Sequence, residues 1–206
     1  MLKIVDLQVG NIGSVVKVVK HLGVDYELIT QPEELVGATK IILPGVGNFT
    51  VAAEKLYSSG FVEALNEHVV NLEVSVLGIC VGMQLLANEG VEGREIGTKG
   101  LGYIDATVKR INDFDGSLII PHMGWNDVDS EGLSLFNGIE NHSCFYFVHS
   151  YAMKINDCKG LNVAYTDYGE DVVAYVQKGH IHGAQFHPEK SQSVGLKFIR
   201  NFIEVC

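Results

Sequence analysis

The first 88 residues switch repeatedly between two hydrophobic patterns. Short continuous apolar runs have the length and β-branched content of buried strands, and segments with apolar side chains three or four positions apart are typical of amphipathic helices. Strands that alternate with helices in this way predict a parallel sheet with helices on both faces. The expected strands are 2–7, 26–30, 40–43 and 74–79, and the expected helical segments are 11–22, 32–35, 48–57 and 61–72.

The remainder of the chain has a different pattern. Residues 89–102 are rich in glycine and charge and predict a loop, and residues 191–205 have the apolar spacing of a closing helix. Between them, short strand-like runs are separated by turn residues such as Lys178-Gly179, as antiparallel hairpins require. We therefore expect an α/β fold with an open, mixed, mostly parallel sheet flanked by helices, in one domain over residues 1–206. The expected strands here are 106–111, 117–120, 144–148, 162–166, 172–177 and 180–186.

A candidate nucleophile lies between the strand 74–79 and a helix expected over 83–88. The segment Gly78-Ile79-Cys80-Val81-Gly82 has the pattern of a nucleophile elbow, with cysteine in place of serine. A sharp turn from strand to helix brings backbone close to backbone, so a Cβ at either glycine would clash. The helix N-terminus favours a thiolate at Cys80, and the N–H of Val81 is available to an oxyanion. The alternative is a buried structural cysteine in an ordinary turn.

The segment His187-Pro188-Glu189 directly follows the last expected strand, where open α/β sheets gather their functional groups. Residues two apart in an extended segment point the same way, and Pro188 keeps His187 out of the helical region. Glu189 can therefore orient the imidazole, as a cysteine nucleophile and its base require. The alternative is a strand-end histidine followed by a helix-opening glutamate. With the cysteine elbow upstream, we expect a catalytic triad of Cys80, His187 and Glu189.

A second oxyanion donor is expected in the turn Pro44-Gly45-Val46-Gly47, which ends the third strand. The backbone N–H groups of Gly45, Val46 and Gly47 are the candidate donors. The alternative, a phosphate-cradling turn, is disfavoured because the third glycine of the dinucleotide fingerprint and a P-loop lysine are both missing.

The segment Pro121-His122-Met123-Gly124-Trp125-Asn126 holds the only tryptophan and has no regular period. Aromatic, methionine and histidine side chains in an irregular loop indicate an interface, and a core tryptophan under a loop is an equally good interpretation. His180 and His182 have no third ligand at a recognisable spacing, so we expect no metal site and no cofactor.

Composition narrows the class of partner. The formal net charge of −10 disfavours nucleic acid and anionic membranes, and no apolar run approaches the length of a membrane span. Asp6 comes too early for the apolar region of a signal peptide. The four cysteines have no CxxC or zinc spacing, so we expect a cytoplasmic protein with free thiols.

Three of these motifs, in this order along the whole chain, resemble those of class I (triad) glutamine amidotransferases. They are the elbow with Met83 and Gln84, the Pro44–Gly47 turn, and Gln185-Phe186-His187-Pro188-Glu189-Lys190. The resemblance implies a flavodoxin-like sheet and glutamine as substrate. Cys80 would attack the carboxamide, His187 would move protons and Glu189 would orient His187. Gln84 and the backbone near Ser150 and Tyr151 would bind glutamine.

Further motifs resemble the small stand-alone glutaminase subunits of histidine biosynthesis. These motifs are the opening Asp6–Asn11, the segment Pro44–Phe49 and the segment His122–Asn126. The resemblance implies a heterodimer with a (βα)8-barrel cyclase that receives ammonia and makes imidazole glycerol phosphate and an aminoimidazole carboxamide ribotide. The residues implied to lie toward that cyclase are Asn11, His122, Trp125, Asn126 and Lys190.

Two positions depart from the usual pattern, Leu7-Gln8 in the opening and Val81 in the elbow. Neither removes a catalytic group. They leave open a paralogue that supplies ammonia to a sugar amidotransferase of surface-polysaccharide synthesis. Less favoured alternatives are a cysteine peptidase and a non-catalytic binding subunit.

Overall fold

A seven-stranded sheet forms the centre of the computed structural model, which describes residues 1–10, 12–94, 96–114 and 116–205. Its order is β11-β12-β13-β4-β3-β1-β2. Strands β13, β4, β3, β1 and β2 run parallel, and β12 is antiparallel to both of its neighbours. The expected open, mixed, mostly parallel sheet is therefore confirmed. The strands are β1 (Leu2–Val5), β2 (Tyr26–Ile29), β3 (Lys40–Gly45), β4 (Ser75–Cys80), β11 (Asn162–Asp167), β12 (Asp171–Lys178) and β13 (Ile181–Ala184).

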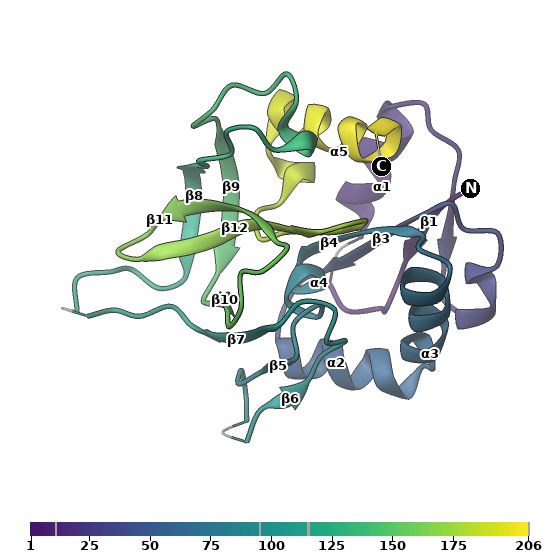
Figure 1. Cartoon of the computed structure of the whole chain (residues 1–206), viewed down its shortest axis with the longest axis horizontal. Helices are drawn as coiled ribbons and strands as arrows, with labels where there is room; N and C mark the ends of the chain where they lie inside the picture. The colour runs from purple at the N-terminus through teal and green to yellow at the C-terminus, as the bar shows by residue number, and fades with distance from the viewer. Residues whose placement is uncertain (11, 95, 115, 206) are drawn as a thin grey trace.

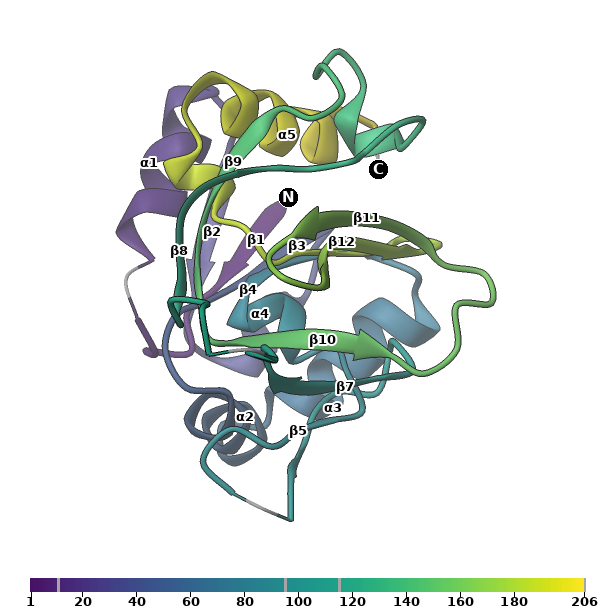
Figure 2. The ribbon, with the colours of Figure 1, turned by 90° about the vertical axis from the view of Figure 1, so that its left-hand side faces the viewer.

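Helices cover both faces of this sheet (Figures 1 and 2). Helices α1 (Gly13–His21) and α5 (Gln192–Val205) lie on one face. Helices α2 (Phe49–Ser58), α3 (Phe61–Leu65) and α4 (Val81–Gln84) lie on the other. Because both faces are covered, β1 and β13 are buried along their whole length. The remaining helical segments are η1 (Pro32–Leu35), the π-helical η2 (Asn66–Asn71), η3 (Ser134–Phe136) and η4 (Pro188–Lys190).

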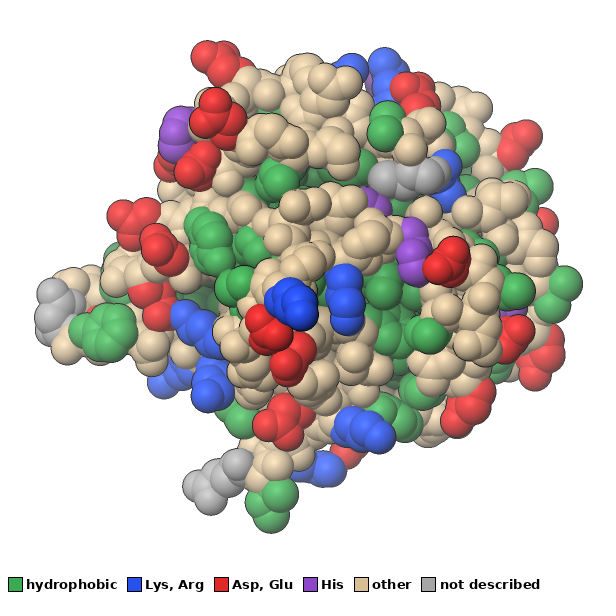
Figure 3. Space-filling view, viewed as in Figure 1, with side chains coloured by type: hydrophobic (Ala, Val, Ile, Leu, Met, Phe, Trp, Pro, Cys, Tyr) green, Lys and Arg blue, Asp and Glu red, His purple; other side chains and the backbone are tan. Residues whose placement is uncertain are grey.

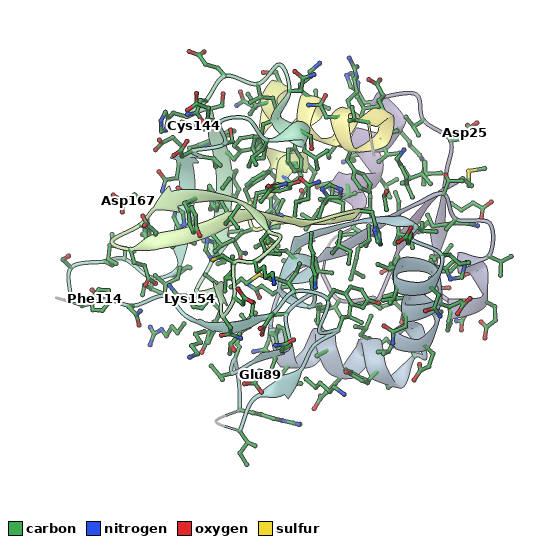
Figure 4. The ribbon with its side chains drawn as sticks, viewed as in Figure 1. Asp25, Glu89, Phe114, Cys144, Lys154 and Asp167 are labelled. Carbon is green, nitrogen blue, oxygen red and sulfur yellow. The ribbon has the colours of Figure 1, made fainter. Side chains whose placement is uncertain are left out.

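Two smaller sheets pack beside the central one. One has the order β10-β7-β5-β6, with β5 (Glu89–Gly90), β6 (Thr98–Lys99), β7 (Ala106–Arg110) and β10 (Tyr151–Ile155). The other pairs β8 (His122–Asp127) with β9 (Cys144–His149) in antiparallel register. In Figure 4, Lys154 marks β10 and Cys144 marks the start of β9.

The structure corrects four expectations. Residues 117–120 are not a strand. Residues 122–127, expected to be irregular, form β8, whose positions alternate between buried or partly buried and exposed. Strand β10 was not expected at all, and the 89–102 loop contains the β5–β6 pair. Pairing with β9 makes β8 a regular strand, although the mixed composition of β8 does not predict one.

The helix after the elbow also differs from its expected bounds. It begins directly at Val81 and ends at Gln84, not over 83–88. The N–H groups that would extend it bond elsewhere: Leu86 N donates to Met83 O and Ala87 N to Gln84 O, each three residues back at 3.0 Å, and Asn88 N donates to Ala106 O at 3.0 Å. The helix therefore ends in tighter three-residue turns, and the first residue of β7 takes the N–H of Asn88.

The surface is mixed in charge. Figure 3 shows acidic and basic side chains interspersed on one face, with acidic groups around its rim. Within the described residues, every helix is too short or too polar to cross a membrane.

Candidate active site

Cys80 stands at the junction of β4 and α4, where the chain turns sharply. Its backbone has φ 53° and ψ −111°, a conformation that costs a non-glycine residue free energy and is found mainly at functional sites. The flanking glycines make this turn possible. A Cβ at Gly82 would lie 1.8 Å from the carbonyl oxygen of Leu43, and one at Gly78 would lie 2.5 Å from that of Gly82. The local geometry is that of a nucleophile elbow.

His187 and Glu189 form a buried pair. His187 Nδ1 donates to Glu189 Oε1 at 2.7 Å, and both side chains are almost fully enclosed. Three further bonds fix the backbone of His187: its N–H donates to Tyr146 O at 2.8 Å, and its carbonyl accepts from Ser191 Oγ at 2.7 Å and from Lys190 N at 3.0 Å. The ring is therefore held in one orientation, with Nε2 as its remaining nitrogen.

The pKa of His187 links the pair to Cys80. Burial, the largest influence, lowers this pKa, but interactions with the Cys80 thiol and then the Glu189 carboxylate raise it to about 9. Within the described residues, His187 Nε2 makes no hydrogen bond of normal geometry. The ring therefore holds its second proton at neutral pH on a nitrogen that is available for exchange.

The expected oxyanion turn lies beside the elbow. Gly45 is in register with Cys80 across the parallel pair β3–β4. A Cβ at Gly45 would lie 2.8 Å from Gly82 N, so only glycine allows this approach. Gly47 has φ +113°, another position suited to glycine.

A small cavity opens next to Cys80 and brings several predicted residues together. Its volume is about 40 Å³. A water needs about 10–15 Å³ by this measure, so the cavity has room for about three waters and not for a whole glutamine. The lining residues are Val46, Gly47, Cys80, Val81, Gln84, Glu92, Val148, His149, Ser150 and Tyr151.

Gln84, expected to bind glutamine, already makes internal hydrogen bonds. Its Nε2 donates to Tyr151 O at 2.8 Å and to Gln185 Oε1 at 3.0 Å. Gln185 in turn donates from Nε2 to Cys80 Sγ at 3.7 Å. These bonds tie the predicted substrate-binding residues to the elbow.

Sequence reasoning missed three polar residues of this site. Glu92 lines the cavity, and its Oε2 accepts from Phe49 N at 2.7 Å, at the start of α2. Gln185 and Ser191 hold Cys80 and His187 as described above. Glu92 lies in a glycine-rich segment with no motif of its own, whereas Gln185 and Ser191 flank the His187 motif and could have been singled out by that proximity.

The residues expected to face a partner lie in different environments. Trp125 is 49% exposed, so the core alternative for it is wrong, and Lys190 Nζ lies 5.7 Å from the ring centre of Tyr146, which Trp125 meets edge-on. His122 is only 2% exposed and presents no surface. Asn126 is partly exposed, and Asn11 lies outside the described residues.

The hydrogen-bond contacts of His180 and His182 do not support a metal site at these two residues. His180 Nε2 donates to Val69 O at 2.7 Å, and His182 Nδ1 lies 2.8 Å from the hydroxyl of Tyr175. No cluster of three or more potential ligands occurs among the described residues.

The elbow, the buried histidine–glutamate pair and the doubly covered sheet are features that the resemblance to class I glutamine amidotransferases implies. The profile of the family "Glutamine amidotransferase class-I" matches residues 3–205. The chain belongs to this family of enzymes.

Curated relatives are similar over the full chain. The identity is 44% with the imidazole glycerol phosphate synthase subunit HisH 1 of Campylobacter jejuni (strain RM1221), covering all of both chains. It is 43% with the subunit HisH of Methanocaldococcus jannaschii, again over all of both chains. It is 40% with the subunit HisH of Leptospira borgpetersenii, over 98% of each.

Solved structures share the fold. A crystal structure of a glutamine amidotransferase superimposes with a TM-score of 0.76 at 24% identity, covering 98% of this chain and 97% of that one. The crystal structure of a glutamine amidotransferase from Thermotoga maritima gives a TM-score of 0.62 at 15% identity, covering 98% of this chain and 82% of that one. At these identities the likeness concerns the fold alone.

Proposed function

We propose that this chain is the glutaminase subunit of an imidazole glycerol phosphate synthase. It hydrolyses glutamine to glutamate and ammonia, and a (βα)8-barrel cyclase uses the ammonia to make imidazole glycerol phosphate and an aminoimidazole carboxamide ribotide in histidine biosynthesis. The observation that carries the proposal is the 44% identity, over all of both chains, to a subunit of that synthase. A biosynthetic role of this kind agrees with the cytoplasm as compartment.

The first half of the reaction forms a thioester. The Cys80 thiolate attacks the carboxamide carbon of glutamine, and the carbonyl oxygen becomes an oxyanion. The N–H groups of Val81 and of the Gly45–Gly47 turn stabilise this charge. The carbon–nitrogen bond then breaks, and the leaving amine takes a proton from His187 and departs as ammonia. A histidine whose pKa is raised to about 9 holds that proton at neutral pH.

The second half releases glutamate. His187, now neutral, takes a proton from a water that attacks the thioester carbon, and the Cys80 sulfur leaves as thiolate. Glu189 holds the imidazole in the required tautomer through the 2.7 Å bond to Nδ1 and stabilises the imidazolium formed again at the end of the cycle.

Glutamine binding uses the walls of the small cavity. Gln84 and the backbone of Ser150 and Tyr151 bind the substrate, and we add Glu92 to this set. Its carboxylate is the acidic side chain on the cavity wall, and a carboxylate there attracts the α-ammonium group of glutamine.

The size of the cavity supports low activity in the isolated chain. Because it has room for about three waters, glutamine enters only when the wall moves. Val46 is the proposed moving part. It lines the cavity and packs against Gly10, where an added Cβ would lie 2.6 Å from Val46 Cβ. A cyclase bound near the opening segment can therefore act on Val46 through Gly10.

The proposed cyclase surface is apolar and is formed by exposed side chains of β8 and of the segment before it. Large apolar side chains exposed in free solution mark interaction sites when they gather in one region. Lys190 and Asn126 supply polar contacts at its edge. The exposed apolar residues are Phe114, Ile119, Met123 and Trp125.

The test is glutamine hydrolysis by the purified chain, alone and with the imidazole-forming cyclase of the same genome and its nucleotide ligand. We expect at least about 10²-fold stimulation of kcat/KM, which corresponds to about 3 kcal/mol of transition-state stabilisation. Cys80→Ala is the control and abolishes the reaction in both conditions. Stimulation only by a sugar amidotransferase partner assigns the chain to the paralogue alternative, and Cys80-independent turnover contradicts the mechanism.

A further inference from the structure

Two buried histidines that the proposed mechanism does not use are joined to each other. His122 Nδ1 and His149 Nε2 are 3.1 Å apart, and His149 Nδ1 lies 2.9 Å from the carbonyl oxygen of Tyr151. A carbonyl oxygen only accepts, so His149 Nδ1 is the donor. In a neutral ring, Nε2 is then the acceptor, and His122 Nδ1 donates to it.

The outer end of this connection reaches the surface at β8. Asn126 Nδ2 lies 3.3 Å from His122 Nε2, which accepts, and it also donates to the carbonyl of Asp167 at 2.8 Å. Asp167 is labelled at the end of β11 in Figure 4. The His122 ring is stacked between Phe147 and Tyr168, with ring centres 4.7 and 3.9 Å away. Its position is therefore fixed from both faces.

The inner end reaches the nucleophile. The Tyr151 carbonyl that accepts from His149 also accepts from Gln84 Nε2, and Gln84 continues through Gln185 to the sulfur of Cys80. Asn126, His122, His149, the Tyr151 carbonyl, Gln84, Gln185 and Cys80 thus form one unbroken series of contacts. We call it the Asn126–Cys80 relay.

Both rings of the relay stay neutral over the physiological range. Burial lowers the pKa of His122 to about 4 and that of His149 to about 3. A neutral imidazole has one donor and one acceptor nitrogen, so each ring can make only the two bonds it makes here. The direction of every bond from Asn126 to the Tyr151 carbonyl follows.

We propose that His149, supported by His122, is a positioning residue of the glutaminase that fixes the Tyr151 carbonyl. Two donors, His149 Nδ1 and Gln84 Nε2, hold this carbonyl in one place. They thereby fix the Ser150–Tyr151 edge of the cavity and the Gln84 amide. The relay also joins the β8 surface proposed to meet the cyclase to the Cys80 cavity. This second part of the inference rests on the proposed function.

The ends of the relay favour positioning over a purely structural role. A buried polar group costs free energy unless it is satisfied, and an apolar ring would fill the same space without that cost. Here each ring nitrogen of the two histidines has a partner, and the series reaches a backbone group of the substrate cavity. The relay therefore ends at a carbonyl, that of Tyr151, whose displacement changes glutamine binding.

The first test asks whether the Nδ1 donor of His149 supports glutamine binding. His149→Phe keeps a planar ring but removes the donor to Tyr151 O. We expect KM for glutamine to rise at least about tenfold, because binding is weakened, and kcat to stay within about threefold of the wild-type value. His149→Asn places an amide nitrogen near the position of Nδ1, so it brings KM back to within about threefold of the wild type. An unchanged KM in folded His149→Phe, or no rescue by Asn, overturns the proposal.

The second test uses a variant that keeps the packing. His122→Phe preserves the stack between Phe147 and Tyr168 and removes both polar contacts of the ring. We expect KM to rise in the same direction but less than in His149→Phe. The double variant has the KM of His149→Phe alone, because the relay is already cut. Multiplicative effects on KM contradict a single relay.

The matched control is His182→Asn, which removes another buried imidazole, one in contact with Tyr175 and outside the relay. We expect a lower melting temperature and an unchanged KM.

The proposed function has its own test, which is the stimulation of the wild type by the cyclase. Absence of stimulation rejects that function, while the KM comparison proceeds on the basal reaction. Labelling of Cys80 by a diazoketone analogue of glutamine, relative to labelling by iodoacetamide, serves as a second readout. A His149→Phe chain labelled as fast as the wild type by both reagents overturns the positioning role.

Discussion

The hydroxyl of Ser191 donates to the carbonyl oxygen of His187 at 2.7 Å and accepts from the N–H of Tyr146 at 3.0 Å. Ser191 is fully buried, so it bridges β9 and the histidine motif without competition from water. Ser191→Ala leaves the Tyr146 N–H unpaired and is expected to lower the free energy of unfolding by about 1–3 kcal/mol. Urea unfolding measures this.

The same change is expected to lower kcat more than it raises KM, because it loosens the base and leaves the cavity walls intact. Ser193→Ala, two residues away on the exposed start of α5, is the control and changes neither quantity. Equal losses in the two variants would assign Ser191 no special role.

Glu189→Gln tests the charge behind His187. The pKa of His187 is raised from 6.5 to about 9 in the fold, with Glu189 among the causes. A raised pKa contributes stability that is fully present below about pH 6.5 and is lost as the pH rises through about 9. Without the carboxylate this pKa falls. We therefore expect a smaller loss of unfolding free energy between pH 6.5 and 9.5 in the variant than in the wild type.

Glutaminase activity gives the second readout of Glu189→Gln. The variant can favour the wrong tautomer of His187, and we expect kcat to fall at least about 10²-fold. A stability profile parallel to that of the wild type, together with normal kcat, would refute the assigned role.

Gly82→Ala tests the steric basis of the elbow. The new Cβ would lie 1.8 Å from the Leu43 carbonyl oxygen, which belongs to β3 and cannot move freely. We expect a loss of more than about 3 kcal/mol of unfolding free energy, in the range of the strongest single substitutions. The control is Gly179→Asn, where space is open and the left-handed φ of 58° suits asparagine. The two melting curves are compared.

The elements closest to the elbow could be predicted because short-range chemistry specifies them. Asn48 caps α2, as asparagine directly before a helix favours, and its side chain accepts from Val51 N at 3.1 Å. The close approach of Gly78 and Gly82 follows from the turn they flank. In such places the local sequence and the final structure obey the same constraint.

Elements whose regularity depends on distant partners could not be predicted. Strand β8 contains His122, Gly124 and Asn126 and has no strand-like composition, yet pairing with β9 orders it. The helix after Cys80 ends early because the N–H of Asn88 bonds to Ala106 O at the start of β7 and not to Gln84 O within the helix. The roles of Gln185 and Glu92 likewise depend on contacts with residues that are distant in sequence and meet them only in the folded chain.

Trp125→Ala tests the proposed cyclase surface. A half-exposed tryptophan that meets the ring of Tyr146, over which Lys190 also lies, has the character of an interface hot spot. Its truncation is therefore expected to weaken the heterodimer by about 2 kcal/mol or more, roughly 30-fold in Kd. Calorimetric titration with the cyclase measures the change. Val36→Ala, at another exposed apolar residue beside η1, is the control and leaves Kd unchanged.

Glu92→Gln tests how the cavity recognises the amino-acid end of glutamine. The amide keeps an oxygen that can accept from Phe49 N, as Glu92 Oε2 does at 2.7 Å, so the wall of the cavity is preserved. Only the negative charge is lost. If this charge attracts the α-ammonium group in the ground state and the transition state alike, KM rises about tenfold and kcat stays within about threefold. Glu89→Gln, on the nearby β5 and outside the cavity lining, is the control (Figure 4).

A substrate without the ammonium group sharpens the Glu92 test. The ω-amide of glutaric acid has the carboxamide that Cys80 attacks but no α-amino group. The wild type and Glu92→Gln should therefore hydrolyse it with the same KM, because the interaction that distinguishes them is absent. A variant that is impaired equally with both substrates would show that Glu92 supports the start of α2 through Phe49 and does not recognise the ammonium group.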